Sequence, residues 1–172
     1  MRRPLAVRTV GPAQWVFYPA LVVIALTVVL ATPVELFGLK LPEPVLPLVL
    51  AFAWPLIRPS MVAPAVLFGL GLFLDMFWGG TLGLWPLCLL LVYGVVLASR
   101  TLLAGQETQV LFVWYAVCAL VAFLLAYLVV TLDAGRAPSL LALIGQVVPT
   151  LLLFPAADWM IHRFDDGDLR FR

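Results

Sequence analysis

Apolar residues follow one another in six long runs along this chain, separated by short segments rich in proline, glycine and charged residues. The runs cover residues 14–31, 44–57, 61–78, 82–99, 110–132 and 139–161. A helix of about 18 residues, rising 1.5 Å per residue, nearly crosses a hydrocarbon core of about 30 Å. The pattern therefore predicts an all-α, polytopic membrane protein: a bundle of six transmembrane helices that forms one integral membrane domain over residues 1–172.

The second run, residues 44–57, is the shortest, and it contains Pro47 and Pro55. As a helix it reaches only about 21 Å, so it spans the membrane only where the bilayer is thin or its flanks help. The alternative is a re-entrant hairpin with the third run, which would bury Arg58 at its tip. We therefore favour two full crossings, with Arg58 at the surface.

Composition agrees with a membrane protein. Hydrophobic residues make up 65% of the chain and charged residues 11%, against an apolar share of about 45 to 50% in soluble domains. The net charge of +1 argues against a nucleic-acid partner, because such proteins need a dense footprint of lysine and arginine. The lipid bilayer is the expected surrounding.

The distribution of basic residues predicts the orientation, since cytoplasmic loops carry the excess of lysine and arginine. With both termini inside, the outside holds only Lys40 and Arg136. The inside then holds Arg2, Arg3, Arg8, Arg58, Arg100, Arg163, Arg170 and Arg172. A cleavable secretory signal is the other interpretation of the N-terminus, but the first run exceeds the roughly 7 to 15 apolar residues of such a signal. We expect an N-in, C-in protein.

One acidic residue, Asp75, lies in the last turn of the third run, directly before a glycine-rich bend. Gly79 and Gly80 end that run, and the fourth run begins after Gly83. This predicts a tight helical hairpin with a carboxylate at its bend. Because a carboxylate facing lipid is costly, three roles are open: capping the turn by accepting N–H groups such as those of Gly80 or Thr81, binding a partner, or handling a proton or substrate.

Gly71 lies one helical turn before Asp75 on the same stripe as Phe68 and Pro64. Residues four apart share a helix face, and glycine there allows another backbone to approach closely. The stripe is therefore one candidate contact face for a partner helix. The other is a stripe in the fifth run, formed by Ala116, Leu120, Phe123 and Tyr127.

The third and fourth runs carry a family resemblance: a glycine-rich helix ending in Leu74-Asp75, then the sequence Gly-Gly-Thr-Leu-Gly-Leu, then a leucine-rich helix closing on Arg100. This pattern resembles the MreD family of bacterial rod-shape-determining membrane proteins. The end of the second run, with Trp54, Pro55, Arg58 and Pro59, looks like the same segment of that family.

The resemblance implies a role in bacterial cell shape and peptidoglycan elongation at the inner (cytoplasmic) membrane. It implies a non-enzymatic scaffold that binds an MreC-like bitopic membrane protein and works with the wall-elongation proteins of the MreB system. It also implies a six-helix arrangement like that of the substrate-binding subunits of energy-coupling-factor transporters. A small-solute transporter subunit is therefore the alternative function, although only Gln146 and Asp75 offer polar groups away from the helix ends.

The residues of catalytic and metal sites are sparse in this sequence. The chain has one histidine, His162, four residues after Asp158; the two can pair on one helix face, and we interpret them as an interfacial anchor rather than a catalytic dyad. Ser139 lies about 34 Å away along the same run, too far to serve as a nucleophile for that histidine. Cys88 and Cys118 lie in apolar runs, where thiols usually act as small hydrophobes. We expect no enzyme activity, cofactor or metal site.

Overall fold

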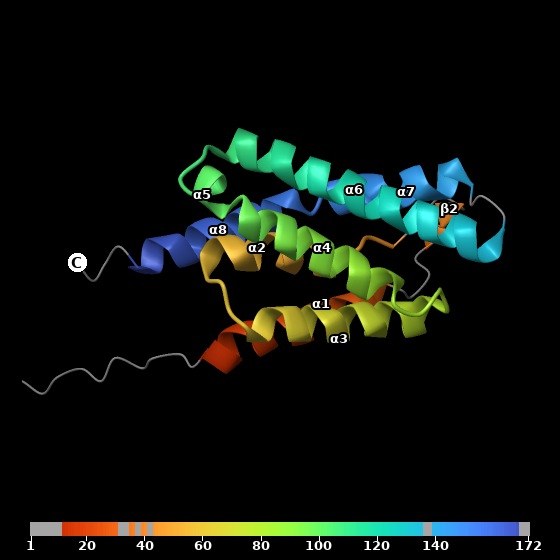
Figure 1. The fold of residues 1–172 in the computed structure, drawn as a ribbon, viewed down its shortest axis with the longest axis horizontal. Coiled ribbons are helices and arrows are strands. Elements are labelled where there is room, and N and C mark those ends of the chain that lie inside the picture. Colours follow the sequence, from red (N-terminus) through yellow and green to blue (C-terminus); the bar gives the residue numbers. More distant parts are fainter. Residues whose placement is uncertain (1–11, 31–34, 37–38, 41–42, 136–138, 169–172) are drawn as a thin grey trace, which may run out of the picture.

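The computed structural model describes residues 12–30, 35–36, 39–40, 43–135 and 139–168, which form a helical bundle (Figure 1). In chain order the elements are α1 (Pro12–Leu30), β1 (Glu35–Leu36), β2 (Leu39–Lys40), α2 (Pro47–Ile57), α3 (Val62–Trp78), α4 (Leu84–Ala98), α5 (Arg100–Leu103), α6 (Thr108–Ala134), α7 (Leu140–Leu151) and α8 (Phe154–Asp168). The prediction of an all-helical fold is confirmed. The two short strands form one antiparallel pair in a segment for which we expected only a loop.

By length and composition, two helical segments of the described chain could cross a membrane: Thr108–Asp133, and Ala142–Arg163, which joins α7 to α8. The other four apolar segments are shorter: Trp15–Leu30, Pro47–Ile57, Val62–Trp78 and Leu84–Ala98. Large apolar side chains are exposed on the long helices. On α6, for example, Val113, Leu120 and Leu124 are more than half exposed.

Helix α2 lies at the centre of the bundle. It packs most extensively against α4 and α8, and α1, α3, α5 and α6 also contact it. Every residue from Pro47 to Pro55 is buried, and Phe52 and Trp54 are fully so. The shortest predicted crossing is therefore the core of the bundle, and its side chains meet protein on every face.

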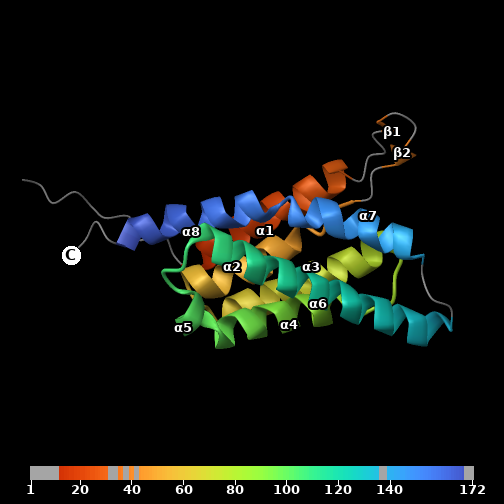
Figure 2. The same cartoon turned by 90° about the horizontal axis from the view of Figure 1, so that it is seen from above.

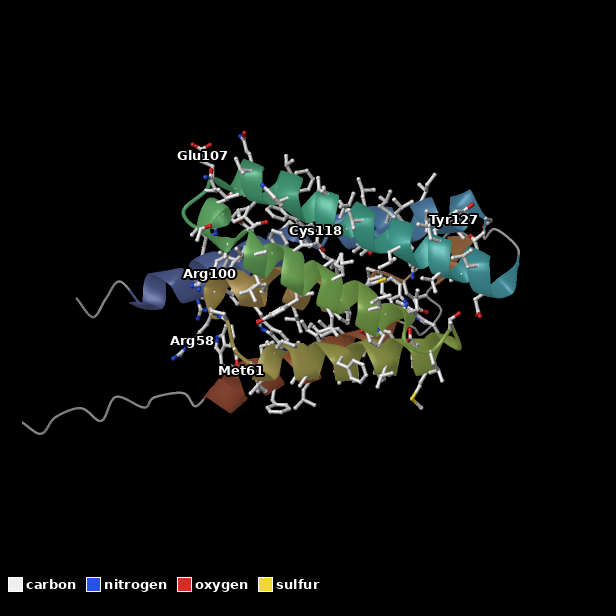
Figure 3. All side chains as sticks on the ribbon, viewed as in Figure 1. Arg58, Met61, Arg100, Glu107, Cys118 and Tyr127 are labelled. Atoms are coloured by element: carbon white, nitrogen blue, oxygen red, sulfur yellow. The ribbon has the colours of Figure 1, made fainter. Side chains whose placement is uncertain are left out.

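The bundle has two ends (Figures 1 and 2). The α5 end holds α5, the start of α1, the α2–α3 loop and the C-terminal part of α8. The hairpin end, opposite to it, holds the α3–α4 turn, the β1–β2 pair, the end of α6 and the start of α7. Arg58 and Arg100 both lie at the α5 end (Figure 3). Arg58 is exposed.

The expectation of one continuous helix over residues 139–161 is wrong, because α7 ends at Leu151 and α8 begins at Phe154. Pro155 has no N–H to donate to the carbonyl of Leu151, and its ring crowds that carbonyl. The chain makes a short turn instead, in which the N–H of Leu153 donates to the carbonyl oxygen of Thr150 at 3.2 Å. The segment 100–109, which we expected to be a polar loop, also contains the helical turn α5.

The start of α2 and the end of α7 meet inside the bundle. The N–H of Val45 donates to the Oγ1 atom of Thr150 at 3.1 Å, and the Tyr115 hydroxyl donates to the Thr150 carbonyl oxygen at 2.9 Å. Val45, Tyr115 and Thr150 are each 0% exposed. Irregular backbone within a membrane-embedded fold needs such internal partners, because lipid supplies none. Thr150 thus links the backbone at the start of α2 to the end of α7.

Replacing Thr150 by valine should lower the free energy of unfolding by about 1 to 2 kcal/mol, because the buried Val45 N–H loses its acceptor while the side-chain shape is kept. Thr150→Ser should retain most of the stability. Thr131→Val is the matched control, because the Thr131 hydroxyl also donates to a carbonyl four residues back, that of Tyr127 in the same helix. Denaturant unfolding in micelles gives the comparison, and equal losses for both valine variants would contradict the role of the Val45 contact.

Candidate functional site: the α3–α4 hairpin

The carboxylate of Asp75 receives the start of α4. Its Oδ2 atom accepts from the N–H of Gly83 at 2.6 Å, and its Oδ1 atom accepts from the N–H of Trp85 at 3.0 Å. These N–H groups lie at the beginning of α4, where a helix has no internal acceptors and where its dipole favours negative charge. The residue is 1% exposed. Of the three roles open for Asp75, capping describes these hydrogen bonds, with Gly83 and Trp85 as donors in place of Gly80 and Thr81.

Two glycines of the bend adopt the left-handed conformation. Gly79 ends α3 with φ 64°, and Gly83 precedes α4 with φ 94°. Side chains disfavour this region of φ, so glycine at both positions allows the chain to reverse within a few residues. Gly80 is not among the positive-φ glycines; its N–H donates to the Asp75 backbone carbonyl at 3.0 Å. The conformational need that we attributed to the Gly79-Gly80 pair thus belongs to Gly79 and Gly83.

Gly71 is the point of closest approach between α3 and α4. A Cβ atom at this position would lie 2.5 Å from Pro86 Cα and 2.7 Å from Pro86 Cδ, distances that real Cβ contacts do not show. The expected close backbone is therefore that of α4 in the same chain. Because Gly71 and Asp75 are both buried, the stripe proposed as a partner face presents only Phe68, at 47% exposure, and the half-buried Pro64.

The hairpin is also fastened to distant parts of the bundle. The Trp78 ring N–H donates to Glu43 Oε2 at 2.7 Å, and the Thr81 hydroxyl donates to Asp133 Oδ2 at 3.0 Å. The Trp85 ring lies edge-on to both Trp78 and Phe123, with centroids 5.5 and 5.8 Å apart. These distant partners could not be predicted from the sequence, because they lie 35 to 52 residues from Trp78, Thr81 and Trp85 along the chain. They tie the bend to the segment before α2 and to the end of α6.

Asp158 and Arg58, the remaining candidates, lie far from the hairpin. The Nδ1 atom of His162 is 2.9 Å from the Asp158 backbone carbonyl oxygen and 3.4 Å from Asp158 Oδ1. The expected pairing along α8 is therefore present. The candidates thus form one cluster at the bend, comprising Gly71, Asp75, Gly79, Gly80 and Gly83, and two separate positions near the α5 end.

Both oxygens of the Asp75 carboxylate accept backbone hydrogen bonds. Cys88 and Cys118 are buried, and the Cys88 thiol donates to the Ala122 carbonyl at 3.4 Å. Among the described residues no group of three or more histidine, cysteine, aspartate or glutamate side chains could hold a metal ion. The hydrogen bonds of the bend position one helix against another.

Comparison with protein-family models, with curated proteins and with solved structures finds no match to this chain.

Proposed function

We propose that this chain is a six-helix protein of the bacterial inner membrane that acts as a non-enzymatic scaffold of the rod-shape and wall-elongation complex, as the resemblance to MreD implies. The observation that carries the proposal is the hairpin. The motif residues Gly71, Asp75, Gly79 and Gly83 act together in one turn, by close packing, capping and left-handed backbone. These residues determine the backbone geometry of the bend and do not form a chemical site. This is what we expect of a protein that functions by binding other proteins.

The exposed surface supports the membrane part of the proposal. Large apolar side chains are exposed along α1, α3, α4, α6 and α7, and extended exposed apolar surface is typical of an interaction with a membrane or another protein. Polar side chains inside the bundle, such as Thr27, Thr150 and Asp75, hydrogen-bond to backbone groups of the chain itself. In this proposal α7 and α8 together make the sixth crossing.

Both described termini point to the α5 end, as an even number of crossings requires (Figure 1). We therefore expect single cysteines replacing Arg3 or Arg170 to resist an impermeant thiol reagent in intact cells. A cysteine at Leu82, which is 72% exposed at the hairpin end, should react. Cys88 and Cys118 are first changed to alanine. Labelling of both tails from outside would refute the N-in, C-in orientation.

The partner in this proposal is an MreC-like protein with one transmembrane helix. Because the Phe68 stripe is closed by α4, the α6 stripe is the better candidate for its docking. There Leu120 is 54% exposed and Ala116 half-buried, while Phe123 is buried against Trp85. The partner helix would pack on the outward part of this stripe, since helices in lipid associate by packing.

The experiment is co-purification in mild detergent. The partner should co-purify with the natural chain and be lost with Leu120→Trp, whose ring blocks close approach. The matched control is Phe68→Trp, an exposed position on α3, which should retain the partner. Depletion of the chain should turn rod-shaped cells round. A chain that captures no such partner in either form would contradict the scaffold function.

One observation favours the alternative, a small-solute transporter subunit. The α7–α8 segment is interrupted inside the bundle, close to the start of α2, where Val45 meets Thr150, and discontinuous helices form the sites of many transporters. Thr150 and Tyr115 are fully buried, and their hydroxyls bond to the chain. Solute uptake by liposomes containing only this protein would decide in favour of the transporter.

A further inference from the structure

A hollow of about 490 Å³ lies on α8 and is lined by Pro155, Asp158, Trp159, His162 and Arg163. Pro155 lies three and four positions before Asp158 and Trp159, and His162 and Arg163 follow those two at four positions each, so the lining residues form two adjacent rows along one side of the helix. Because α8 runs toward the α5 end, which also carries Arg58 and Arg100 (Figures 1 and 3), this face lies where the proposed fold meets the headgroup layer. Tryptophan is enriched at that level, and Trp159 is 61% exposed.

The hollow contains one group of each charge. The Oδ1 atom of Asp158 is buried and lies 3.4 Å from His162 Nδ1, while the Asp158 side chain as a whole is 24% exposed. A carboxylate has about four lone-pair sites, so its exposed part can accept from a further donor. Asp158 therefore supplies the negative charge of the hollow and can accept from a cationic group.

Arg163 supplies the positive charge. The central carbon of its guanidinium lies 5.4 Å from the centroid of the Trp159 ring, in a cation–π contact. This contact fixes the guanidinium above the ring while its N–H groups remain able to bind an anion. Arginine is well suited to phosphate, since its planar fork donates two parallel hydrogen bonds.

We infer that this face binds the headgroup of an ethanolamine phospholipid, with the ammonium donating to Asp158 and the phosphate accepting from Arg163. The headgroup is a zwitterion, and the hollow offers the complementary pair of charges. A choline headgroup has the same net charge but no N–H donor for Asp158. A glycerol headgroup has hydroxyl donors but no positive charge to pair with the Asp158 carboxylate. The inference rests on the membrane placement proposed above, but not on the partner or on the role in cell shape.

The test is lipid binding to the full chain in detergent, with phosphatidylethanolamine, phosphatidylcholine and phosphatidylglycerol of equal acyl length counted by native mass spectrometry. The natural chain should bind the ethanolamine lipid about fivefold more tightly than the choline lipid, as one partly exposed charged hydrogen bond allows. Asp158→Asn should remove this preference. The control Asp133→Asn, an exposed acid at the hairpin end, should keep it.

Arg163→Gln gives a second test at an exposed position, and it should weaken binding of all three lipids about equally. Equal binding of ethanolamine and choline lipids by the natural chain would overturn the inference, as would a preference that survives Asp158→Asn. A preference for phosphatidylglycerol would assign the face to a phosphate alone and overturn it too. A chain that prefers the ethanolamine lipid but captures no partner would refute the scaffold function and leave this site standing.

Discussion

Gly71→Ala is expected to destabilise the protein by about 2 to 3 kcal/mol, although it adds a single methyl group in an apolar helix. The new Cβ would lie 2.5 Å from Pro86 Cα, and because that atom belongs to the backbone it cannot rotate away. The two helices would have to separate along their contact, which would weaken the hydrogen bonds of Asp75 to α4. Denaturant unfolding in micelles, with the amount of folded protein in membranes as a second measurement, gives the effect.

Gly69→Ala is the control, two residues away on the same helix. Nothing lies within 4 Å of a Cβ at Gly69, and alanine is the better helix former by up to about 1 kcal/mol. This variant should be as stable as the natural protein or more so. The two substitutions are chemically identical and should differ in sign. A Gly71→Ala protein as stable as Gly69→Ala would show that the close approach of α3 and α4 does not exist.

Asp75→Leu should cost about 2 to 4 kcal/mol, because the N–H groups of Gly83 and Trp85 lose their acceptors at a buried position. Asp75→Asn should cost about half as much, since its amide oxygen can still accept one of the two bonds. The amount of each variant in the membrane and its unfolding free energy give the order. The control is Asp133→Asn, which changes an exposed carboxylate bonded to Thr81.

The same variants test the assigned role of Asp75. If capping is the role, loss of function should follow loss of folded protein across the series. An Asp75→Asn protein that is present at normal abundance but has no function would show that the charge itself is needed. Partner binding and proton handling would then be the remaining roles for Asp75.

The bend could be predicted because its residues are unusual for their surroundings. An acid in an apolar run and glycines after it mark a turn whatever the rest of the fold is. The donors to Asp75 could not be predicted, because the chain brings the N–H groups of Gly83 and Trp85 to the carboxylate only when Gly79 and Gly83 are left-handed. The spacing of residues along the sequence does not reveal this path of the backbone.

The central position of α2 in the bundle could not be predicted, for a different reason. In soluble proteins a polar face reveals which side of a helix is exposed, but in residues 47–57 every side chain is apolar. A helix at the centre of the bundle and a helix in contact with lipid then look alike. The break between α7 and α8 was not predicted although Pro149 and Pro155 are visible in the sequence, because a proline can also kink a helix without ending it.

The central place of α2 has a consequence for how the protein is made. Its 11 residues rise about 16 Å, well short of a hydrocarbon core of about 30 Å, and the N–H of Val45, just before α2, is paired with Thr150. During synthesis α2 leaves the ribosome about a hundred residues before that threonine, so this contact cannot form as α2 emerges. In the proposed membrane fold, α7 and α8 would therefore complete the packing of α2 only after the rest of the chain has been made.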